Sequence, residues 1–479
     1  MENRLKEECG VFGVYNHPEA SALVALGLHA LQHRGQEACG INSFDGKNFY
    51  LIKRRGLVGD NFTDPKIIDQ LKGHTAIGHN RYSTTGAPLI RNIQPFFADL
   101  HTGGLGIAHN GNLTNAISIR EKMVKEGAIF QSTSDTETLV QLIAKSKRSK
   151  TIDKIIDAVF QVQGGYALTI MTNKKLVGIR DPFGIRPLVL GKLKDSYILS
   201  SETCALDIIG ANFIREIDNG EIIIIDKNGI ESIKPFPKVK SRPCVFEYVY
   251  FSRPDSIVGG KAVHQYRKKL GEELAKEIRI DADIVSAVPD SGIPAAIGYS
   301  NQSKIPYDMG IIRNHYVGRT FIEPTQQIRQ LGVKLKHNAN KEIIKNKKLI
   351  LVDDSIVRGT TSKKIVDMLY SAGAKEIHLC ISSPPIKYPD YYGIDTPNIE
   401  DLIAANNSVE EIRKLIGVDS LQFLSIDGLY RALGYDQRDN NNPQFTDHCF
   451  TGEYPVQPLD QLNQLEKNNQ LSLLSNVRL

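Results

Sequence analysis

The stretch Lys347–Met368, KKLILVDDSIVRGTTSKKIVDM, constrains the fold of this chain more than any other. An apolar run rich in β-branched residues precedes two acidic residues and a loop of glycine and hydroxyl residues, after which the apolar spacing becomes helical. A buried strand, a polar loop and a helix in this order form half of a βαβ unit. The N-terminus of such a helix offers unpaired backbone N–H groups and a positive dipole end. The stretch therefore predicts an α/β unit that binds a phosphate-bearing ligand, with the hydroxyl residues 360–362 capping the helix.

Two acidic residues, Asp353 and Asp354, stand directly beside this predicted phosphate site. Carboxylates repel phosphate, so they suit this place only if they hold sugar hydroxyls or a magnesium ion. An ordinary strand–loop–helix crossover with an acidic cap is the alternative for a lone Asp-Asp pair. The complete pattern LILVDDSIVRGTT, however, resembles the phosphoribosyl-diphosphate (PRPP) loop of type I phosphoribosyltransferases.

Length and composition bound the class of protein. A chain of 479 residues exceeds the usual size of one hydrophobic core, so we expect two domains. The 59 Lys and Arg residues barely outnumber the 54 Asp and Glu residues, and the net charge of +5 argues against nucleic-acid binding. No apolar run reaches the length of a membrane span, and the N-terminus lacks the apolar core of a signal peptide. Six widely spread cysteines form no disulfide framework, which predicts a cytoplasmic protein.

The first half of the chain has the pattern of an antiparallel α+β structure. Asp45-Gly46 and Asn228-Gly229 are typical hairpin turns, and helical spacing covers residues 23–31. Ser134 precedes a second helical stretch, which predicts a helix N-cap. Layers of helices and antiparallel strands are therefore expected in this half. The predicted strands include residues 40–44, 48–53, 76–78, 105–108, 166–171, 188–191 and 221–225.

Cys9 directly precedes an apolar strand, Gly-Val-Phe-Gly-Val, and follows the polar segment Met1–Glu8. A buried structural cysteine near a frayed terminus is the common alternative. However, the motifs CGVFG, HRGQE, GHNRYST, HNG and SDTE follow one another along the chain. Together they resemble the class II glutamine amidotransferase domain, an N-terminal-nucleophile hydrolase with αββα layers. In that family the cysteine is the mature N-terminal residue, so the resemblance implies removal of Met1–Glu8 as a propeptide.

Such processing has a chemical reason. A thiol needs a base to become a strong nucleophile, and a free α-amine, with a pKa of about 7.7–8.0, can serve. The resemblance implies that the Cys9 thiolate attacks the glutamine carboxamide. It also implies that the Asn110 side chain and the Gly111 backbone N–H stabilise the resulting oxyanion. The glutamine-binding residues implied by the resemblance are Arg34, Arg81, Thr84 and Asp135.

The two charged ends of free glutamine suit two of these residues. Arg81 is expected to hold the α-carboxylate and Asp135 the α-ammonium. For Arg34, a role as a structural or domain-interface charge is an equal alternative to glutamine binding. Three histidines are expected to be strand-end hydrogen-bonders rather than general bases: His33, His79 and His109.

The second half has the alternating pattern of strands and helices. It begins after a linker rich in Pro and Lys at 231–243. Helical spacing covers residues 263–275 and resumes after Ala295. The predicted strands include residues 245–251, 284–288 and 376–382.

Two further loops of this half suit an anionic ligand. Pro289–Pro294 follows a predicted strand and can receive a second phosphate, because ligands of open parallel sheets bind at the carboxyl ends of strands. The stretches 313–319 and 327–336 are basic and contain glycine, which suits a loop that closes over an anion. A solvated basic surface is the alternative for any single lysine there.

Both halves together resemble the amidophosphoribosyltransferase family. The resemblance implies an α+β glutaminase domain followed by an α/β type I phosphoribosyltransferase domain with a mainly parallel sheet. It also implies a reaction, the first committed step of purine biosynthesis: glutamine, PRPP and water give 5-phosphoribosylamine, glutamate and diphosphate. The expected division of the chain is a propeptide 1–8, a glutaminase domain 9–235, a phosphoribosyltransferase domain 244–460 and a polar tail 461–479.

The same resemblance assigns roles around the PRPP loop. Asp353 and Asp354 are expected to hold the ribose hydroxyls and, with Ser291, a magnesium ion. Residues 355–361 are expected to bind the 5-phosphate and residues 290–292 the diphosphate. The expected PRPP-binding residues are Asp290, Ser291, Gly292, Arg319, Lys336, Asp353, Asp354, Ser355, Arg358, Gly359, Thr360 and Thr361.

The resemblance also implies feedback by purine nucleotides, AMP, GMP or ADP, and a homodimer or homotetramer. A dry passage between the domains would keep the ammonia neutral. Two other classes share part of the pattern. A sugar-phosphate amidotransferase would share the first half but carry an isomerase fold without the PRPP loop. A PRPP-sensing repressor would share that loop but carry a DNA-binding module in place of the Cys-led domain.

One branch of the family carries a four-iron, four-sulfur cluster held by four cysteines. The matching positions here are Cys244, Asp390, Thr446 and Cys449, so only two thiols remain. Cubane clusters generally need four cysteine ligands, and we therefore expect this chain to lack the cluster. A zinc site built from Cys, His and Asp residues is the alternative, with His448 beside the pattern.

Overall fold

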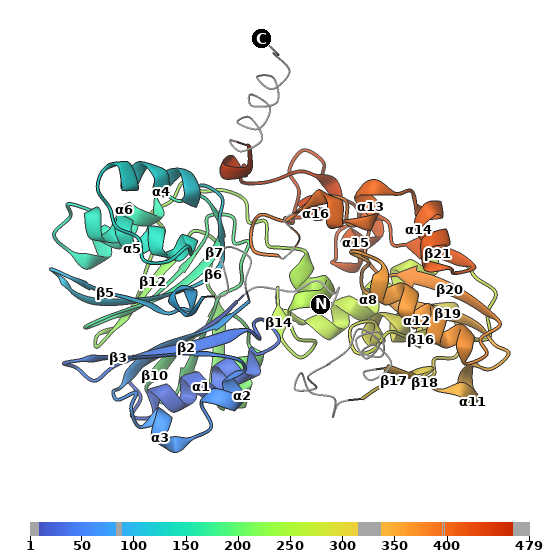
Figure 1. Ribbon diagram of the computed structural model, residues 1–479, viewed down its shortest axis with the longest axis horizontal. Helices are drawn as coiled ribbons and strands as arrows, with labels where there is room; N and C mark the ends of the chain where they lie inside the picture. The colour runs from blue at the N-terminus through green and yellow to red at the C-terminus, as the bar shows by residue number, and fades with distance from the viewer. Residues whose placement is uncertain (1–8, 83–88, 315–336, 395, 397, 463–479) are drawn as a thin grey trace, which may run out of the picture.

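The computed structural model describes residues 9–82, 89–314, 337–394, 396 and 398–462. Figure 1 shows two lobes side by side, one formed by the first half of the chain and one by the second. Each lobe holds one of the two predicted fold types. The predictions for Met1–Glu8, Thr84, Arg319, Lys336 and residues 463–479 of the tail lie outside the described residues.

The strand that begins beside Cys9 is central in an antiparallel sheet of the first lobe. β1 (Gly10–Tyr15) pairs with β10 on one side and β4 on the other, so both of its edges are hydrogen-bonded. In spatial order the seven strands are β11 (Asn212–Glu216), β9 (Val189–Leu193), β10 (Ser196–Ser200), β1, β4 (Thr75–Arg81), β2 (Ala38–Phe44) and β3 (Phe49–Arg55). The helices on this side are α1 (Ala20–Ala30), α2 (Val58–Asn61), α3 (Pro65–Ile68) and α7 (Cys204–Ile208).

A second antiparallel sheet lies against the first. In spatial order its six strands are β13 (Gly229–Ile233), β12 (Ile222–Asp226), β8 (Leu176–Arg180), β7 (Gly164–Thr172), β6 (Gly103–Leu113) and β5 (Phe96–Leu100). Three helices pack on its outer face: α4 (Ala116–Lys125), α5 (Asp135–Lys145) and α6 (Thr151–Val159). The short helix η1 (Ile90–Asn92) precedes β5.

Alternating side chains of the strands build the layers of this lobe. Neighbouring residues of a strand point to opposite faces of the sheet. On β1, Val11 joins the core between the two sheets, whereas Phe12 and Val14 join the core beneath α1. The lobe therefore has helix, sheet, sheet and helix layers, and the predicted αββα arrangement is confirmed.

The second lobe is built on a parallel sheet. Its strands, in spatial order, are β16 (Ile284–Ala287), β19 (Lys348–Asp353), β20 (Glu376–Ile381) and β21 (Ser420–Phe423), and all neighbouring pairs are parallel. Helices α8 (Val263–Glu277), α9 (Ile293–Ser303) and α15 (Ile426–Ala432) pack on one face, and α12 (Thr360–Ser371) and α14 (Val409–Ile416) pack on the other. The shorter elements are β14 (Ile257–Val258), β15 (Lys261–Ala262), β17 (Ile311–Arg313), β18 (His337–Ala339), α11 (Lys341–Ile344), η3 (Ile399–Asp401), α13 (Ile403–Asn406) and α16 (His448–Thr451).

The strand predicted at 245–251 is wrong. Residues Glu247–Phe251 form a π-helical turn, η2, in which the backbone N–H of Ser252 donates to the carbonyl oxygen of Glu247. The guanidinium of Arg267 donates to the carbonyl oxygens of Tyr248 (3.0 Å) and Ser252 (2.7 Å) and so stabilises the turn. The aromatic and β-branched run suggested a strand, but its apolar side chains pack around the turn in the core of the lobe.

Three boundaries also differ from the predictions. Thr360 and the two residues after it do not cap α12 but form its first turn, because Gly359 takes the N-cap position with a φ of 72°. The linker begins later than residue 231, since β13 continues to Ile233. Strands β4 and β6 run through the residues 79–81 and 109–111, which were expected to follow the strands.

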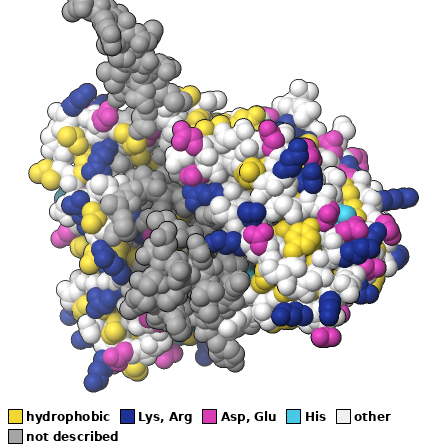
Figure 2. Space-filling view, turned by 45° about the vertical axis from the view of Figure 1, so that its right-hand side comes forward, with side chains coloured by type: hydrophobic (Ala, Val, Ile, Leu, Met, Phe, Trp, Pro, Cys, Tyr) yellow, Lys and Arg dark blue, Asp and Glu magenta, His cyan; other side chains and the backbone are white. Residues whose placement is uncertain are grey.

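The described surface carries mixed charge. On the face shown in Figure 2, Lys and Arg side chains are interspersed with Asp and Glu side chains rather than gathered into one basic surface. This mixture agrees with the small net charge of the chain. Among the described residues, no helix has both the length and the apolar character that crossing a membrane requires.

Candidate active sites and the contact between the lobes

Cys9 lies at the start of the central strand of the first lobe, and only 7% of its surface is exposed. Its backbone nitrogen donates a hydrogen bond to the carbonyl oxygen of Arg34 (3.1 Å), in the segment after α1. Its Sγ lies 3.9 Å from the carbonyl oxygen of Tyr82, one residue beyond β4. The φ of Cys9 is 77°, a region that non-glycine residues adopt uncommonly and that concentrates at functional sites. The thiol is therefore fixed between two segments far apart in the sequence.

Asn110 and Gly111 lie in β6, in the second sheet of the same lobe. Both polar atoms of the Asn110 side chain are buried and have no hydrogen-bond partner among the described residues. Leaving a buried polar group without a partner costs about 1–3 kcal/mol, so this side chain is free to bind a ligand or a water molecule. Gly111 has a φ of 124°, and a Cβ there would lie 2.0 Å from the carbonyl oxygen of Gly165. Only glycine fits this position.

A buried histidine links the nucleophile strand to this region. In the first sheet, Gly10 of β1 pairs with Asn80 of β4. The Nε2 atom of the neighbouring His79 lies 3.1 Å from the carbonyl oxygen of His109 on β6. Burial lowers the pKa of His79 to about 3, so the neutral ring donates to that oxygen. This geometry agrees with the prediction of a hydrogen-bonding histidine.

Asp135 begins α5 and faces the same strand. The side chain of Ser134 accepts from the N–H of Thr136 (3.3 Å), so the predicted N-cap is confirmed. One carboxylate oxygen of Asp135 accepts from the N–H of Leu113 (3.0 Å) and lies 3.6 Å from His109 Nδ1. Burial alone would raise the pKa of Asp135, but His109 and the backbone N–H groups lower it below its usual value. The charged carboxylate suits an ammonium ligand.

The predicted metal residues meet at the carboxyl ends of neighbouring parallel strands. Asp353 is the last residue of β19, and its Oδ1 accepts from the N–H of Asp354 (3.0 Å) and lies 3.5 Å from Ser291 Oγ. Asp354 Oδ2 accepts from the hydroxyl of Ser355 (2.7 Å). Carboxylate and hydroxyl oxygens are the donors that magnesium prefers, so these residues fit the expected ion.

Other described members of the predicted PRPP set surround this point. A Cβ at Gly292 would lie 2.4 Å from the carbonyl oxygen of Val352, so the two loops touch through their backbones. Gly359 adopts a left-handed φ of 72°, which turns the chain into α12. Among the described residues, the ion pairs at this end of the sheet include Asp290 with Arg313 and Arg358 with Asp401.

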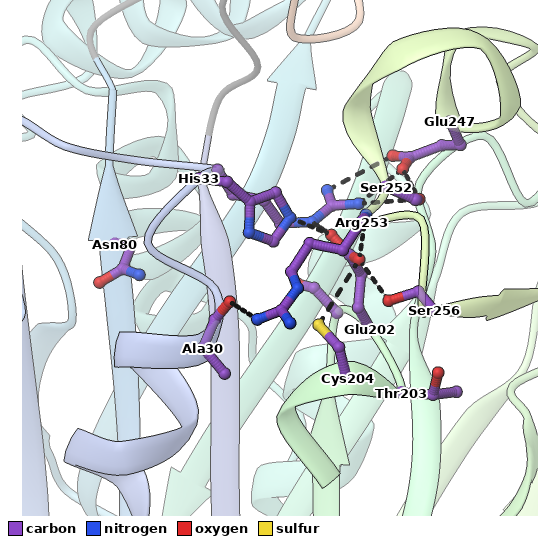
Figure 3. Close-up of polar contacts among 12 residues, drawn as sticks. Ala30, His33, Asn80, Glu202, Thr203, Cys204, Glu247, Ser252, Arg253 and Ser256 are labelled. Carbon is purple, nitrogen blue, oxygen red and sulfur yellow. Dashed lines mark hydrogen bonds and ion pairs between the residues drawn. The ribbon is translucent and has the colours of Figure 1, made fainter. Parts of the chain in front are cut away.

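A buried cluster of charges joins the two lobes (Figure 3). The side chain of Arg34 has no exposed surface, and its guanidinium binds Glu202 of the first lobe and Glu247 of the second (Nη2 to Oε2, 2.5 Å). Glu202 also accepts from the backbone N–H of Arg253 (2.9 Å) and the hydroxyl of Ser256 (2.6 Å). Burial alone would raise the pKa of Glu202, but the neighbouring positive charges, led by Arg34, hold it well below its usual value.

The expected contact between Arg34 and glutamine stays a prediction, but the side chain already has other partners. Its guanidinium is bound by two buried carboxylates of the lobe contact. The alternative prediction, a domain-interface charge, describes this side chain. Arg34 still reaches the glutaminase site, but through its backbone carbonyl, which binds Cys9.

Sequence reasoning missed three residues of this contact. Glu247 accepts from Arg34, Arg186 lies 3.8 Å from Glu247, and Arg267 holds the turn that presents Glu247. Burial lowers the pKa of Arg267, and the charges of Asp354 and Glu202 oppose this effect. A charged residue inside the apolar run VFEYVYF was the signal that could have pointed to Glu247.

The four positions of the family's iron–sulfur cluster come together in the second lobe but do not fit one. Cys244 and Thr446 are backbone partners, and Cys244 and Cys449 are buried. The hydroxyl of Thr446 donates to a backbone carbonyl oxygen (2.5 Å). Asp390 Oδ2 lies 2.8 Å from His448 Nε2. Both non-cysteine positions are therefore engaged, and two thiols do not complete a cubane ligand set.

The fold and the sites define a class: a glutamine amidotransferase joined to a phosphoribosyltransferase. The glutamine amidotransferase domain family matches residues 79–207, and the phosphoribosyl transferase domain family matches residues 260–390. These two matches correspond to the two lobes of the structure.

Similarity to known proteins extends over nearly the whole chain. It is 58% identical over 477 residues to the amidophosphoribosyltransferase of Rhizobium etli, covering 98% of this chain and 96% of that protein. It is 50% identical over 461 residues to the chloroplastic amidophosphoribosyltransferase 1 of Arabidopsis thaliana, covering 96% of this chain and 80% of that protein. The structure of the Bacillus subtilis glutamine PRPP amidotransferase complexed with ADP and GMP matches with a TM-score of 0.89 at 46% identity, covering 94% of this chain and 98% of that one.

The chain therefore belongs to the amidophosphoribosyltransferase family. Its activity is the glutamine-dependent conversion of PRPP to 5-phosphoribosylamine in purine biosynthesis, and the predicted function is confirmed. The predicted order of a glutaminase domain before a phosphoribosyltransferase domain is confirmed as well.

Proposed function

We propose that this chain hydrolyses glutamine at Cys9 and stabilises the oxyanion with Asn110 and Gly111. One observation carries the proposal: the side-chain amide of Asn110 is buried and has no hydrogen-bond partner among the described residues. A preorganised donor of this kind is what an oxyanion hole offers before the substrate arrives. Arg81, Thr84 and Asp135 bind the charged ends of glutamine.

Removal of Met1–Glu8 leaves the α-amine of Cys9 at the place of the backbone nitrogen, 3.1 Å from the carbonyl oxygen of Arg34. This carbonyl orients the amine, which takes the proton of the thiol. The thiolate attacks the carboxamide carbon, the C–N bond breaks, and ammonia leaves with that proton. Water then hydrolyses the thioester and releases glutamate. The glutaminase domain accordingly spans residues 9–235.

PRPP binds at the carboxyl ends of β16 and β19, in a phosphoribosyltransferase domain that spans residues 244–460. Asp353 and Asp354 hold the ribose hydroxyls, residues 290–292 the diphosphate, and residues 355–361 the 5-phosphate. Arg319 and Lys336 contribute positive charge. Ser291, Asp353 and Asp354 would hold a magnesium ion, which would neutralise charge on the leaving diphosphate. Ammonia attacks C1 of the ribose, and the bond to diphosphate breaks.

The ammonia travels between the lobes. In water it would mostly become ammonium, which is no nucleophile, so a dry passage is required. The buried cluster of Arg34 with Glu202 and Glu247 supports this proposal, because it fixes the two sites relative to each other. In this scheme the side chain of Arg34 organises the lobe contact instead of binding glutamine.

Three further properties follow from the family. The Bacillus subtilis relative was solved with ADP and GMP bound. We propose that purine nucleotides, AMP, GMP or ADP, inhibit this chain at or beside the PRPP site. We also propose a homodimer or homotetramer in the cytoplasm.

We propose that the chain contains no iron–sulfur cluster. The observation that supports this is the engagement of Asp390 with His448 and of Thr446 with a backbone carbonyl. Cys244 and Cys449 are buried thiols, and burial raises the pKa of Cys244 to about 12. Both thiols pack in the core of the second lobe.

The variant Asn110→Ala tests the oxyanion site. Loss of one oxyanion donor lowers kcat by about 100- to 1,000-fold, so glutamine-dependent synthesis should fall by that factor. Synthesis from high ammonia should stay normal, because it bypasses the glutaminase site. Normal glutamine hydrolysis in this variant would overturn the assignment.

A further inference from the structure

Asp390 organises the loop that follows it. Its Oδ1 accepts hydrogen bonds from three consecutive backbone N–H groups, those of Tyr392 (2.7 Å), Gly393 (2.8 Å) and Ile394 (2.7 Å). Its Oδ2 lies 2.8 Å from Nε2 of His448, and both side chains have no exposed surface. Successive N–H groups that converge on one oxygen form a concave anion-binding turn, so the carboxylate holds the loop in one shape.

The groups around Asp390 favour the charged form of its carboxylate. Burial alone would raise the pKa of Asp390, but the hydrogen bond and charge of His448, with the backbone N–H groups, lower it below its usual value. The His448 ring also packs edge-on against the ring of Tyr392, with centroids 4.9 Å apart. His448 begins α16, so the pair ties that helix to the loop.

The loop fixed in this way contacts the first lobe at its oxyanion strand. The side-chain amide of Asn112 donates to the carbonyl oxygen of Tyr391 (2.9 Å). A Cβ on Gly393 would lie 3.0 Å from the Cα of Gly111. The backbones of the two lobes therefore touch at Gly111, the glycine whose N–H is proposed to stabilise the oxyanion.

The same group could be taken for a metal site. Donor atoms of Asp390, His448 and Cys449 lie within 4.8 Å of one another. However, Oδ1 of Asp390 already accepts from three N–H groups, and Nε2 of His448 lies 2.8 Å from Oδ2 of Asp390 and 3.3 Å from Sγ of Cys449, so the three donors already contact one another. A carboxylate saturated in this way is a structural anchor rather than an open ligand set.

We propose that Asp390 and His448 are positioning residues for glutamine hydrolysis. They fix residues 391–394 of the second lobe against Gly111 and thereby hold the oxyanion N–H in place. This inference rests on the proposed role of Gly111. Asp390 and His448 would then contribute to the glutaminase reaction although they lie outside the glutaminase lobe.

The location of the pair makes the proposal testable. Asp390 and His448 belong to the lobe that binds PRPP, whereas Gly111 belongs to the lobe that hydrolyses glutamine. A pair that merely stabilised its own lobe would, when lost, lower glutamine-dependent and ammonia-dependent synthesis together. A pair that positions Gly111 would affect glutamine hydrolysis alone.

The main experiment compares Asp390→Ala and Asp390→Asn in the full chain, with glutamine and with ammonia as nitrogen source. Misplacing a catalytic group by about 1 Å costs about 100-fold, so Asp390→Ala should lower kcat for glutamine by that order. The KM for glutamine and the ammonia-dependent kcat should stay unchanged. Asp390→Asn keeps an oxygen for the three N–H groups and should recover most of the loss.

Two further variants guard against misfolding as the explanation. Asp447→Asn removes another buried carboxylate, which accepts from Tyr430 (2.8 Å) and Arg438 (2.6 Å). It should destabilise the protein without changing the ratio of glutamine-dependent to ammonia-dependent activity. Gly393→Ala places a Cβ 3.0 Å from the Cα of Gly111 and from Nη2 of Arg186, at a φ of 123°, and should lower glutamine hydrolysis more than ammonia-dependent synthesis.

The outcomes separate the two proposals. Equal loss of both activities in Asp390→Ala, or normal glutamine turnover in Asp390→Ala and Gly393→Ala, would overturn the positioning role. If Asn110→Ala loses glutamine hydrolysis while these variants keep it, only this inference fails. If Asn110→Ala itself keeps glutamine hydrolysis, the proposed oxyanion site fails.

Discussion

The backbone nitrogen of Cys9 donates to the carbonyl oxygen of Arg34 at 3.1 Å, and the guanidinium of the same Arg34 binds Glu247 of the opposite lobe at 2.5 Å. One residue thus contacts the predicted nucleophile with its backbone and the PRPP-binding lobe with its side chain. The geometry at Cys9 therefore depends on how the two lobes dock.

Replacing Arg34 should destabilise the protein strongly. Arg34→Met leaves Glu202 and Glu247 buried without their shared cation, and breaking a buried pair in this way costs about 3–5 kcal/mol. Urea unfolding measures this change. Arg148→Met is the control, because its exposed ion pair with Asp157 lies away from the lobe contact and contributes about 0–1 kcal/mol. Equal stability of Arg34→Met and the native protein would contradict a structural role.

The same cluster should make stability depend on acid. The pKa of Glu202 is lowered in the folded state, so its contribution is present above its unfolded pKa of about 4.3 and is lost as pH falls below it. Glu202→Gln should therefore differ most from the native protein near neutral pH, and the difference should shrink in acid. Unfolding free energies of both proteins across this range measure it. A difference that grows as pH falls would have the wrong sign.

Cys9→Ser should abolish glutamine-dependent synthesis and leave synthesis from high ammonia. The reason is that a hydroxyl is far less readily deprotonated by the α-amine than a thiol. Cys39→Ser is the control, since Cys39 is a buried core thiol on β2, and burial raises its pKa to about 12. Phosphoribosylamine formation from each nitrogen source measures the effect. Normal glutamine turnover in Cys9→Ser would exclude it as the nucleophile.

The double variant Asp353→Asn with Asp354→Asn should lose both glutamine-dependent and ammonia-dependent synthesis, because both require bound PRPP. Isothermal titration calorimetry of PRPP with magnesium should show the loss directly. Asp367→Asn on the exposed face of α12 is the control, and its pair with Lys363 should contribute little. Unchanged PRPP binding in the double variant would contradict the role of these carboxylates.

Anaerobically purified protein should be colourless and contain no stoichiometric iron. Its four cluster positions offer two thiols, a carboxylate bound to His448 and a hydroxyl bound to a backbone carbonyl. Absorption spectra and metal analysis check this. A brown protein with about four irons per chain would prove the prediction wrong. Stoichiometric zinc would instead contradict the hydrogen-bonded state of Asp390.

Most of the structure that could be predicted from the sequence was predicted from short contiguous motifs. The strand, acidic pair and loop around Asp353 are local, because neighbouring residues build the whole unit. The lobe contact is different: Arg34 and Glu247 stand 213 positions apart, and nothing local marks them as partners. The wrong prediction of a strand at 245–251 has a related cause. This segment is buried on all sides, so it lacks the alternation of apolar and polar residues that identifies a strand.

The position of Asp390 shows a second limit. Its sequence context revealed that a cysteine was missing, but not what the aspartate does instead. That answer depends on three backbone N–H groups converging on one oxygen, which only the folded loop provides.

The buried charges between the lobes also bear on whether this chain can be divided. A fragment that ends in the linker would carry Arg34 and Arg186 without Glu247, and the remainder would carry Glu247 without either cation. Ile185 would lose its place in the core of the second lobe. Cutting the linker should therefore leave two pieces that stay associated, whereas expressing either piece alone should give an insoluble product. A transplant between related enzymes should therefore move both lobes together, so that Arg34 and Arg186 keep Glu247.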